Sequence, residues 1–507
     1  MQEFPSEGLV GREANVDLPG KDGCCWTATA PETSYPALSG KQRVEVAIVG
    51  GGIAGLSAAL PLAEAGCSVA VLEALRVGRQ VTGRSTAKVT TQHALIYDHL
   101  IETLGRETAA LYAEANKAGM ARILDWIDAH GIDCDLERKS AYVYIDPERD
   151  RLEDLNRETE AALSFGLPAD VVDRAPLPFA TGGAVRFTEQ AQFNPARYLI
   201  GLAGAVAAAG GTLYESSRIV ALEQSGRWTL STGSAEVEAD HVLLTTNLPI
   251  GGPDDYSQRT QPRYHVAMAF RIDPAKAPDG MFIAAEDPVH SFRQARDQEG
   301  DLLLVLGPRF STGQEGDVAS HFRELEQWTR IRFEVGAAAW RWANEDYDTA
   351  SRIPFVGEPF AEAKGLHIAT GFNGWGITNG TAAGLLLADE VLARPNPWSA
   401  LYTPDRKSPD DFHQSGKTQS KVASIDEIPR GSGGVIEKGE EKLAVWRDDD
   451  GAMHAFSATC PHKGCTVTWN NAVSTWDCPC HGSIFAAGGS VLHGPAVKPL
   501  EPRRLPS

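Results

Sequence analysis

The 507-residue sequence predicts an α/β unit followed by a small all-β module. The first observation is the run VEVAIVGGGIAGLSAALPLAEAGCSVAVLEA from Val44, which predicts a β-branched strand, a glycine-rich turn, a helix and a second strand. The second is residues 395–421, where Pro, Ser, Asp and Lys predominate, as is typical of a linker. The third is the sequence from Val422 onward, whose short apolar runs and Gly/Pro turns predict strands.

The composition is that of an ordinary globular chain, with 42% apolar and 22% charged residues. Lys and Arg number 47 and Asp and Glu 67, so the net charge is −20. Nucleic acids and anionic membranes bind clustered cations, so this balance argues against both as partners. The uncharged stretch from Val46 to Ala63 contains glycines and Pro61, which favours strand, turn and helix over a membrane span. We expect a cytoplasmic protein without a membrane span or secretion signal.

The rest of the chain divides by its periodicity. Residues 1–42 lack a sustained pattern and are expected to form an irregular arm over the surface. Residues 365–370 have a strand pattern. Helical patterns are found in these segments: 93–131, 195–210, 319–333 and 377–392. The linker at 395–421 implies that residues 422–507 form an independent module, whose removal would leave the remainder folded.

The glycine-rich turn has the spacing of a dinucleotide-binding site. Gly50, Gly52 and Gly55 form G-x-G-x-x-G between a strand and a helix. The first glycine permits a tight turn, the second lets the backbone approach a pyrophosphate, and the third lets the helix pack on the sheet. The helix N-terminus then faces phosphate charge, and Glu73, which ends the second strand, can accept hydrogen bonds from ribose hydroxyls. This motif alone does not separate NAD from FAD.

Three further segments separate the two cofactors by resemblance. GRSTAK (83–88), VLLTTN (242–247) and ATGFNGWGITNG (369–380) resemble the glycine-oxidase and D-amino-acid-oxidase superfamily of FAD-dependent oxidoreductases. The resemblance covers roughly Val44 to Leu392. It implies a Rossmann-like FAD domain, split in sequence, covered by an α+β substrate domain with an antiparallel sheet. It also places the last motif beside the flavin, where a helix N-terminus stabilises negative charge on the reduced ring.

The resemblance also defines the expected boundaries and contacts. The oxidoreductase would occupy 43–394, with FAD-binding segments mainly at 43–95, 190–255 and 346–394 and substrate-domain segments mainly at 96–189 and 256–345. We expect non-covalent FAD to contact the following residues: Gly50, Gly52, Ile53, Ala54, Gly55, Glu73, Arg84, Ser85, Thr86, Asn247, Gly371, Asn373, Gly374, Gly376 and Ile377.

Four of the eight cysteines lie close together near the C-terminus. Two short loops each offer one thiolate and one imidazole, in the pattern C-x-H-x15-C-x-x-H formed by Cys460, His462, Cys478 and His481. Such a set suits a Rieske [2Fe–2S] cluster, in which two thiolates hold one iron and two histidines hold the other. It also suits a Cys2His2 zinc site.

The sequence around these four residues favours the cluster over zinc. The run CPCHGS, the additional Cys465 and Cys480, and the Gly494-Pro495 turn together resemble the Rieske family over roughly 422–499. The resemblance implies a disulfide between Cys465 and Cys480 that ties the two loops together. We therefore expect a C-terminal all-β Rieske domain over 422–507 with a single [2Fe–2S] cluster.

Catalytic side chains are less evident. Lys88 lies in the loop expected to pass the flavin, where it would stabilise negative charge on the ring or pair at the surface. His93 is either a catalytic candidate or a core histidine with its hydrogen bonds satisfied. Arg293 and Trp342 fall in the expected substrate cover, where each contacts substrate or serves the packing of the domain.

These features predict a flavin dehydrogenase with two partners. A small amine or amino acid would donate a hydride to FAD, and the cluster would pass electrons singly to an external acceptor that the sequence does not identify. The first alternative is an NAD(P)H-dependent reductase that sends electrons outward through the cluster, although no second nucleotide motif is visible. The second alternative is a non-enzymatic redox sensor.

Overall fold

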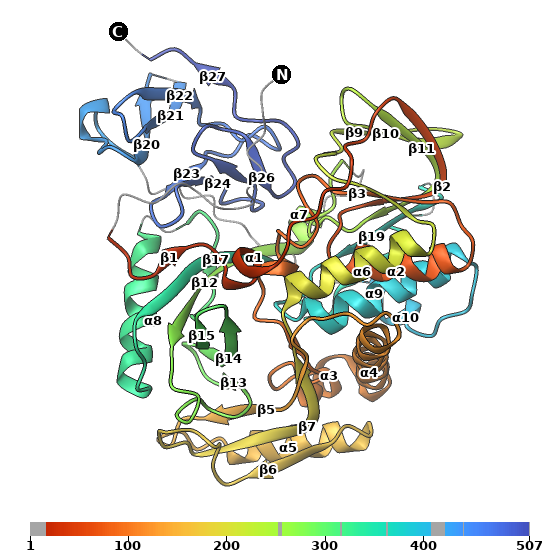
Figure 1. Cartoon of the computed structure of the whole chain (residues 1–507), viewed down its shortest axis with the longest axis vertical. Helices are drawn as coiled ribbons and strands as arrows, with labels where there is room; N and C mark the ends of the chain where they lie inside the picture. The colour runs from red at the N-terminus through yellow and green to blue at the C-terminus, as the bar shows by residue number, and fades with distance from the viewer. Residues whose placement is uncertain are drawn as a thin grey trace.

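The computed structural model describes residues 17–251, 256–314, 317–360, 363–406, 421–439 and 441–505. An α/β half and a second half built on a large sheet lie side by side, and the C-terminal module rests above the second half (Figure 1). In that view the module, drawn in blue, lies over the end of the large sheet where β1, β12 and β17 are labelled.

The α/β half has the strand order β18-β19-β11-β2-β3-β8, with β9 and β10 attached to β11. Strands β19, β11, β2, β3 and β8 pair in parallel, and β18 is antiparallel. The strands are β2 (Lys41–Val49), β3 (Val69–Leu72), β8 (Thr212–Tyr214), β9 (Ala221–Ser225), β10 (Arg227–Ser231), β11 (Glu236–Leu244), β18 (Phe355–Gly357) and β19 (Leu366–Thr370). This is the Rossmann-like arrangement that the sequence predicts.

Three helices pack together against this sheet: α2 (Ile53–Glu64), α6 (Pro195–Ala208) and α9 (Gly376–Val391). Helix α2 is almost entirely buried because it is apolar on every side. Two glycines let α9 approach α2 closely, since a Cβ on Gly384 would lie 2.6 Å from the Ala54 carbonyl oxygen and one on Gly380 2.7 Å from the Ile53 side chain. This close packing fixes the start of α2, and the glycine turn before it, against α9.

The second half is built on an eleven-stranded sheet with the main order β1-β17-β12-β15-β14-β13-β5-β7-β4. Its pairs are antiparallel except β1 with β17 and β5 with β13. The strands are β1 (Lys21–Asp22), β4 (Lys88–Val89), β5 (Glu137–Ile145), β6 (Ala169–Val172), β7 (Gly183–Gln192), β12 (Thr260–Arg271), β13 (Met281–Ala284), β14 (Ser291–Asp297), β15 (Gly300–Leu306), β16 (Phe310–Ser311) and β17 (Ala338–Thr349). The remaining helices before the module are α1 (Cys25–Thr29), η1 (Thr82–Arg84), α3 (Tyr97–Leu104), α4 (Arg106–Ala129), α5 (Leu152–Ser164), α7 (Tyr256–Arg259), α8 (Val318–Arg332) and α10 (Ser399–Tyr402).

The C-terminal module consists of two four-stranded antiparallel sheets, β20-β21-β22-β27 and β23-β24-β25-β26. After the short η2 (Ile425–Glu427), its strands are β20 (Ser432–Lys438), β21 (Glu441–Arg447), β22 (Met453–Ser457), β23 (Thr468–Asn470), β24 (Thr475–Asp477), β25 (Ile484–Ala486), β26 (Val491–His493) and β27 (Pro502–Arg503). The two cysteine–histidine loops connect β22 to β23 and β24 to β25. An all-β module is the fold expected from the sequence.

The module shares an apolar core with the second half. Val473, Ile484 and Leu492 pack in one buried cluster with Val266 and Phe322. The composition of a linker carries no information about such an interface, because the interface depends on the apolar faces of the units it joins. Residues 407–420 lie outside the described residues, and the part of the expected linker before them includes α10, whose Leu401 and Tyr402 are buried.

The described part of the N-terminal arm is buried near Trp26, whereas residues 31–42 are mostly exposed, as expected of a surface arm. Residues 1–16 lie outside the described residues, but β1 pairs in parallel with β17, and Cys24, Cys25 and Trp26 are buried. Trp26 donates from Nε1 to the carbonyl oxygen of Ser85, 2.9 Å away. A segment this short shows no periodicity in sequence even when it is buried, which is why its packing was not foreseen.

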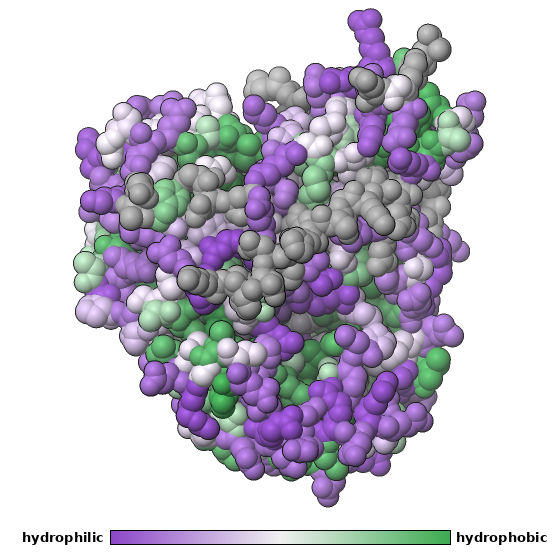
Figure 2. All heavy atoms as spheres, turned by 180° about the vertical axis from the view of Figure 1, so that it is seen from behind, coloured by the Kyte–Doolittle hydropathy of each residue, from purple (hydrophilic) through white to green (hydrophobic). Residues whose placement is uncertain are grey.

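Within the described part of the chain, no helix combines the length and apolarity needed to cross a membrane. The face in Figure 2 is largely hydrophilic, with green apolar side chains gathered in separate patches. The exposed large apolar residues among those described are Leu152, Leu163 and Ile331.

Candidate functional site

A cavity of about 880 Å³ opens between the two halves and the module. Most of the expected cofactor residues line it: Gly50, Gly52, Ile53, Ala54, Glu73, Ser85, Thr86, Asn247, Asn373, Gly374, Gly376 and Ile377. These residues come from the ends of β2, β3 and β11, from the loop before β4, and from the start of α9. The cavity therefore lies at the carboxyl ends of the parallel strands, where dinucleotides bind in such folds.

The first glycine motif fits a pyrophosphate. Gly50 has a φ of +109°, and a Cβ there would lie 2.7 Å from the carbonyl oxygen of Thr245. A Cβ on Gly52 would meet only Thr82 Oγ1, at 3.5 Å, so the backbone of Gly52 borders open cavity. Gly52 caps α2 without a side-chain hydrogen bond, which leaves helix N–H groups available to an anion.

Glu73 is held in the cavity by the backbone. Its two carboxylate oxygens accept hydrogen bonds from Gly51 N at 2.8 Å and Leu75 N at 2.9 Å. Burial raises the pKa of Glu73, while these two hydrogen bonds and the charge of Arg218 oppose that rise. The carboxyl group is thus fixed beside the glycine turn, as a ribose-binding acid must be.

The second glycine motif presents the N-terminus of α9 to the cavity. Trp375 caps this helix without a side-chain hydrogen bond. Asn373, at a φ of +57°, accepts from Thr349 N at 2.8 Å, and Gly374 N donates to Asp346 Oδ2 at 2.6 Å. Burial raises the pKa of Asp346 to about 6. The uncapped N–H groups of α9 fit the expected role beside an electron-rich ring.

Three expected cofactor residues do not line the cavity. Gly55 packs against the Gly50 carbonyl oxygen, and Gly371 packs against Thr349, so both shape the turns rather than the cavity wall. The Arg84 guanidinium is buried and donates to the carbonyl oxygen of Ala343 at 3.0 Å. Arg84 therefore joins the loop to β17.

Two of the four catalytic candidates line the cavity. Lys88 is buried and donates from Nζ to the Phe282 carbonyl oxygen at 3.0 Å and to Ser291 Oγ. Burial, reinforced by the charge of Arg293, lowers the pKa of Lys88 to about 7. His93 has both ring nitrogens engaged, Nδ1 with Tyr112 Oη at 2.6 Å and Nε2 with the Thr90 carbonyl oxygen at 3.0 Å. Burial lowers the pKa of His93 to about 3, so its ring is neutral.

The other two candidates are buried and hydrogen-bonded to backbone carbonyl groups. Arg293 is fully enclosed, donates to the carbonyl oxygens of Phe193 and Thr86, and lies 4.9 Å over the Trp26 ring. Trp342 is buried and donates from Nε1 to the Arg84 carbonyl oxygen at 2.8 Å. Neither belongs to the cavity wall.

Several charged residues of the cavity wall have no sequence motif. Arg263 and Arg309 pair with Asp348 across β12, β17 and the loop after β15, with the Arg309 Nη2 to Asp348 Oδ1 distance at 2.7 Å. Arg218 and His493 also line the wall. Alternation of polar residues along β12 and β17 was the available sequence signal for Arg263 and Asp348. No sequence signal pointed to Arg309, Arg218 or His493.

The four expected cluster ligands lie on the two loops of the module. Cys460, Cys478 and His481 are buried, and the rings of His462 and His481 are 4.9 Å apart. The hydrogen bond with Cys478 lowers the pKa of Cys460 to about 7. His462 Nδ1 is buried without a hydrogen-bond partner, so it is free to bind a metal. Two thiols and two imidazoles in this arrangement fit a Rieske cluster.

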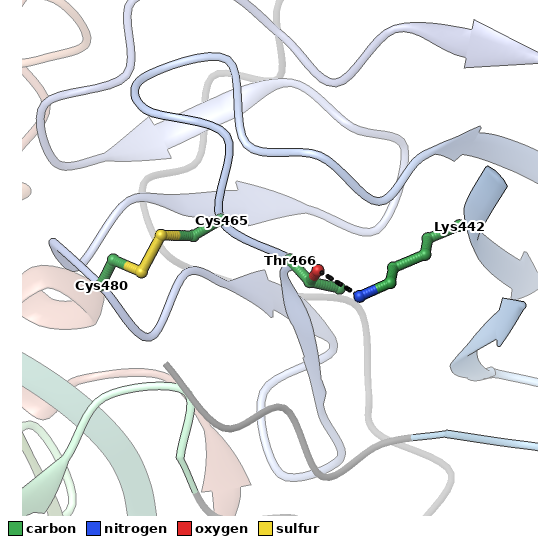
Figure 3. Close-up of a disulfide and its surroundings, with 4 residues drawn as sticks. All are labelled: Lys442, Cys465, Thr466 and Cys480. Atoms are coloured by element: carbon green, nitrogen blue, oxygen red, sulfur yellow. Dashed lines mark hydrogen bonds between the residues drawn. A yellow bond between two sulfur atoms is a disulfide. The ribbon is translucent and has the colours of Figure 1, made fainter. Parts of the chain in front are cut away.

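A disulfide joins the two loops. Cys465 and Cys480 are bonded, at a sequence separation of 15 residues (Figure 3). Their sulfur atoms lie within 4.8 Å of the sulfur of Cys478, but a bonded pair offers no thiolate. Cys460 and Cys478 are therefore the cysteines of these loops that remain available as ligands. Thr466, which follows the disulfide, accepts from Lys442 Nζ at 3.2 Å.

Two protein-family models match this chain. Residues 45–390 match the FAD dependent oxidoreductase family, and residues 418–504 match the Rieske [2Fe-2S] domain. The chain belongs to the FAD-dependent oxidoreductases and carries a C-terminal Rieske domain. Its family binds FAD, and its C-terminal domain type binds a [2Fe–2S] cluster, so the expected cofactors are confirmed.

Curated relatives and solved structures agree with this assignment. A protein of Bacillus subtilis (strain 168), YhfW, named as a Rieske 2Fe-2S iron–sulfur protein, is 31% identical over 94% of this chain and 96% of its own length. Gamma-glutamylputrescine oxidoreductase of Escherichia coli (strain K12) is 25% identical over 70% of this chain and 85% of its own. Glycine oxidase of Geobacillus kaustophilus has a similar fold, with a TM-score of 0.60 and 21% identity over 72% of this chain and 99% of its own.

Proposed function

We propose that this oxidoreductase removes a hydride from a small amine or amino acid and delivers the electrons, one at a time, to an external acceptor. Bound FAD accepts hydride as a pair of electrons, and a [2Fe–2S] cluster takes up single electrons. The observation that carries the proposal is that one cavity is bordered by the FAD motifs, by Lys88 and by the Rieske domain. The names of gamma-glutamylputrescine oxidoreductase and glycine oxidase support an amine donor.

Lys88 suits the role of the base that prepares the amine. An ammonium group cannot release hydride readily, because its nitrogen has no lone pair to stabilise the resulting cation. Both contacts of Lys88 Nζ are donated hydrogen bonds, so the neutral form keeps its lone pair for a substrate proton. With a pKa of about 7, Lys88 is neutral in a large fraction of molecules at neutral pH.

The proposal is tested by anaerobic mixing of the holoprotein with a panel of amines and amino acids, and separately with NADH. Flavin absorbance bleached by an amine, followed by bleaching of the cluster absorbance, is the expected result. Bleaching by NADH alone would favour the reductase instead. Bleaching by none of these donors would favour the redox sensor.

The base is tested by the pH dependence of flavin reduction. In the wild type, kcat/KM for the amine should rise with pH through about 7, because Lys88 must lose its proton to act. Lys88→Met should lose that rise and slow reduction by about 10²–10⁴-fold. Lys276→Met, which removes an exposed lysine paired with Glu334, is the matched control. A Lys88→Met profile that keeps the rise near pH 7 would exclude Lys88 as the base.

A further inference from the structure

The Rieske domain supplies part of the wall of the flavin cavity. Leu492, His493, Gly494 and Val497 line the same cavity as the glycine turn of β2 and α2. They belong to β26 and to the turn that follows it, at the end of the second sheet of the domain. The cavity is therefore incomplete without a segment that the sequence assigns to a different domain.

His493 is held in this wall by residues of the flavoprotein part. Its Nε2 lies 3.5 Å from Glu345 Oε2 and 3.4 Å from Asn247 Nδ2. Arg218 donates to the Val491 carbonyl oxygen at 3.1 Å, in the same strand. Burial, with the charges of Arg218 and Arg84, lowers the pKa of His493 to about 4. Burial raises the pKa of Glu345, so at this contact burial disfavours the charged form of both side chains.

The nucleotide end of the cavity lies close to this strand. Arg218 lines the cavity, and its charge acts on both Glu73 and His493. Glu73 is the acid at the end of β3 that fits a ribose. Residues that bind the nucleotide and residues that hold β26 therefore meet at Arg218.

Further contacts between the two parts hold the domain in this position. Asn471 Oδ1 accepts from Ala319 N at 3.1 Å, and its Nδ2 donates to Asp317 Oδ1 at 2.9 Å, so the Rieske domain caps the N-terminus of α8. The Tyr347 hydroxyl donates to the His481 carbonyl oxygen at 3.0 Å. These contacts, with the shared apolar core, position β26 at the cavity.

We propose that FAD binding and docking of the Rieske domain are thermodynamically linked, with His493 and its neighbours in β26 forming a cofactor-contacting wall. A ligand that binds the docked form more tightly must stabilise docking by the same free energy. The linkage requires that this cavity holds FAD, the cofactor that the family binds. It does not depend on which substrate reduces the flavin.

Hydrogen exchange on the full chain tests this linkage directly. Apoprotein that retains its cluster is compared with the same protein after addition of FAD. Amides of 491–497 should exchange several-fold more slowly with FAD bound. So should amides of 318–321, the first turn of α8, where Ala319 N donates to Asn471 Oδ1 away from the cavity. Strand β22 lies in the other sheet of the domain and should be unchanged. Equal exchange of 491–497 and 318–321 with and without FAD would overturn the proposal.

Full-chain variants provide a second measurement, the dissociation constant of FAD. His493→Ala should weaken FAD binding by about tenfold. This factor corresponds to the loss of about 1.4 kcal/mol, the net contribution of one hydrogen bond. His454→Ala, which removes a partly exposed histidine of the same domain paired with Asp448, should bind FAD as the wild type does. His493→Ala with wild-type affinity would overturn the proposal.

A variant remote from the cavity separates linkage from direct contact. Asn471→Ala removes the cap on α8 without touching the cavity wall, so exchange at 318–321 should accelerate and FAD binding should weaken together. Faster exchange with an unchanged dissociation constant would mean that docking and FAD binding are independent. No amine turnover enters these measurements, so a failure of the proposed activity would not be mistaken for a failure of the linkage.

Discussion

The flavin cavity and the cluster site are built in opposite ways. The residues of the cavity wall extend from Val49 to Val497, whereas the four expected cluster ligands lie within 460–481. The cluster site closes within two loops tied by a disulfide, while the wall of the cavity is complete only when both halves and the Rieske domain are in place. A local site can be recognised from residue spacing. An assembled site is visible in sequence only where a motif constrains the backbone.

The largest expected effect is in the first glycine motif. Gly52→Val should abolish FAD binding yet leave a folded apoprotein, because its side chain would enter open cavity where the pyrophosphate fits. Gly55→Val should instead destabilise the fold by about 1–3 kcal/mol, since its side chain would overlap the Gly50 carbonyl oxygen. Flavin content after desalting measures FAD binding, and chemical denaturation measures the free energy of unfolding. Together the two measurements separate these outcomes. Stoichiometric flavin in Gly52→Val would show that the pyrophosphate binds elsewhere.

Deletion of residues 422–507 tests whether the assembled site depends on the Rieske domain. The truncated protein should lose about 2–5 kcal/mol of stability, because the partners of Val473, Ile484 and Leu492 become exposed. It should also bind FAD more weakly. Chemical denaturation compares the stability of the truncated and full-length proteins, and FAD titration compares their affinity for the cofactor. Equal stability and affinity would mean that the domain is independent, as the linker composition suggests.

Loss of the disulfide should affect the local site more than the cavity. Replacing both Cys465 and Cys480 by Ser should destabilise the Rieske domain by about 3 kcal/mol, the loop-closure effect expected for a separation of 15 residues. On heating, the visible circular dichroism of the cluster should disappear before the flavin signal changes. Cys67→Ser, outside the domain, is the control. Coincident loss of both signals at the wild-type temperature would contradict this expectation.

The smallest effects concern the electronic environment of the cluster. Ser483 Oγ accepts from Ala496 N at 3.1 Å and hydrogen-bonds the Cys460 sulfur. Phe485 is buried in the same apolar cluster as Cys460 and Cys478 and has no hydroxyl to donate. Hydrogen bonds to the sulfurs favour the more negative reduced state. Protein-film voltammetry should show a lower potential in Ser483→Ala and a higher one in Phe485→Tyr, and no rise in the latter would mean that residue 485 does not face the cluster.

Elements with strong local signals were predicted almost to the residue. The helix expected at 195–210 is Pro195–Ala208, and the one expected at 377–392 is Gly376–Val391. For the first, Asn194 accepts from Arg197 N as an N-cap, with proline in the first turn. Capping and periodicity act within a few residues, so they can be read without knowledge of the rest of the chain.

Side-chain direction was predicted less well. Arg84 stands in a motif loop that borders the cavity, yet its guanidinium turns to the carbonyl oxygen of Ala343. Trp342 in turn donates to the carbonyl oxygen of Arg84, so the two residues brace the loop against β17. The sequence led us to expect an FAD contact for Arg84 and left substrate contact or packing open for Trp342. The observed contacts join two segments more than 250 residues apart in sequence, so residue type could not fix the direction of either side chain.

The sequence alone determined the chemistry available to this protein: a strand–turn–helix that binds a dinucleotide, a second glycine turn, and two loops with two thiols and two imidazoles. Each depends on bonds and hydrogen bonds between near neighbours, whose geometry follows from spacing. Only the tertiary structure decided that Cys24, Cys25 and Trp26 are buried, that Lys88 reaches the cavity, and that His493 of the Rieske domain forms part of its wall. Those placements follow from apolar faces and buried polar groups that find partners far along the chain, and the free energy of such packing is a property of the assembled molecule.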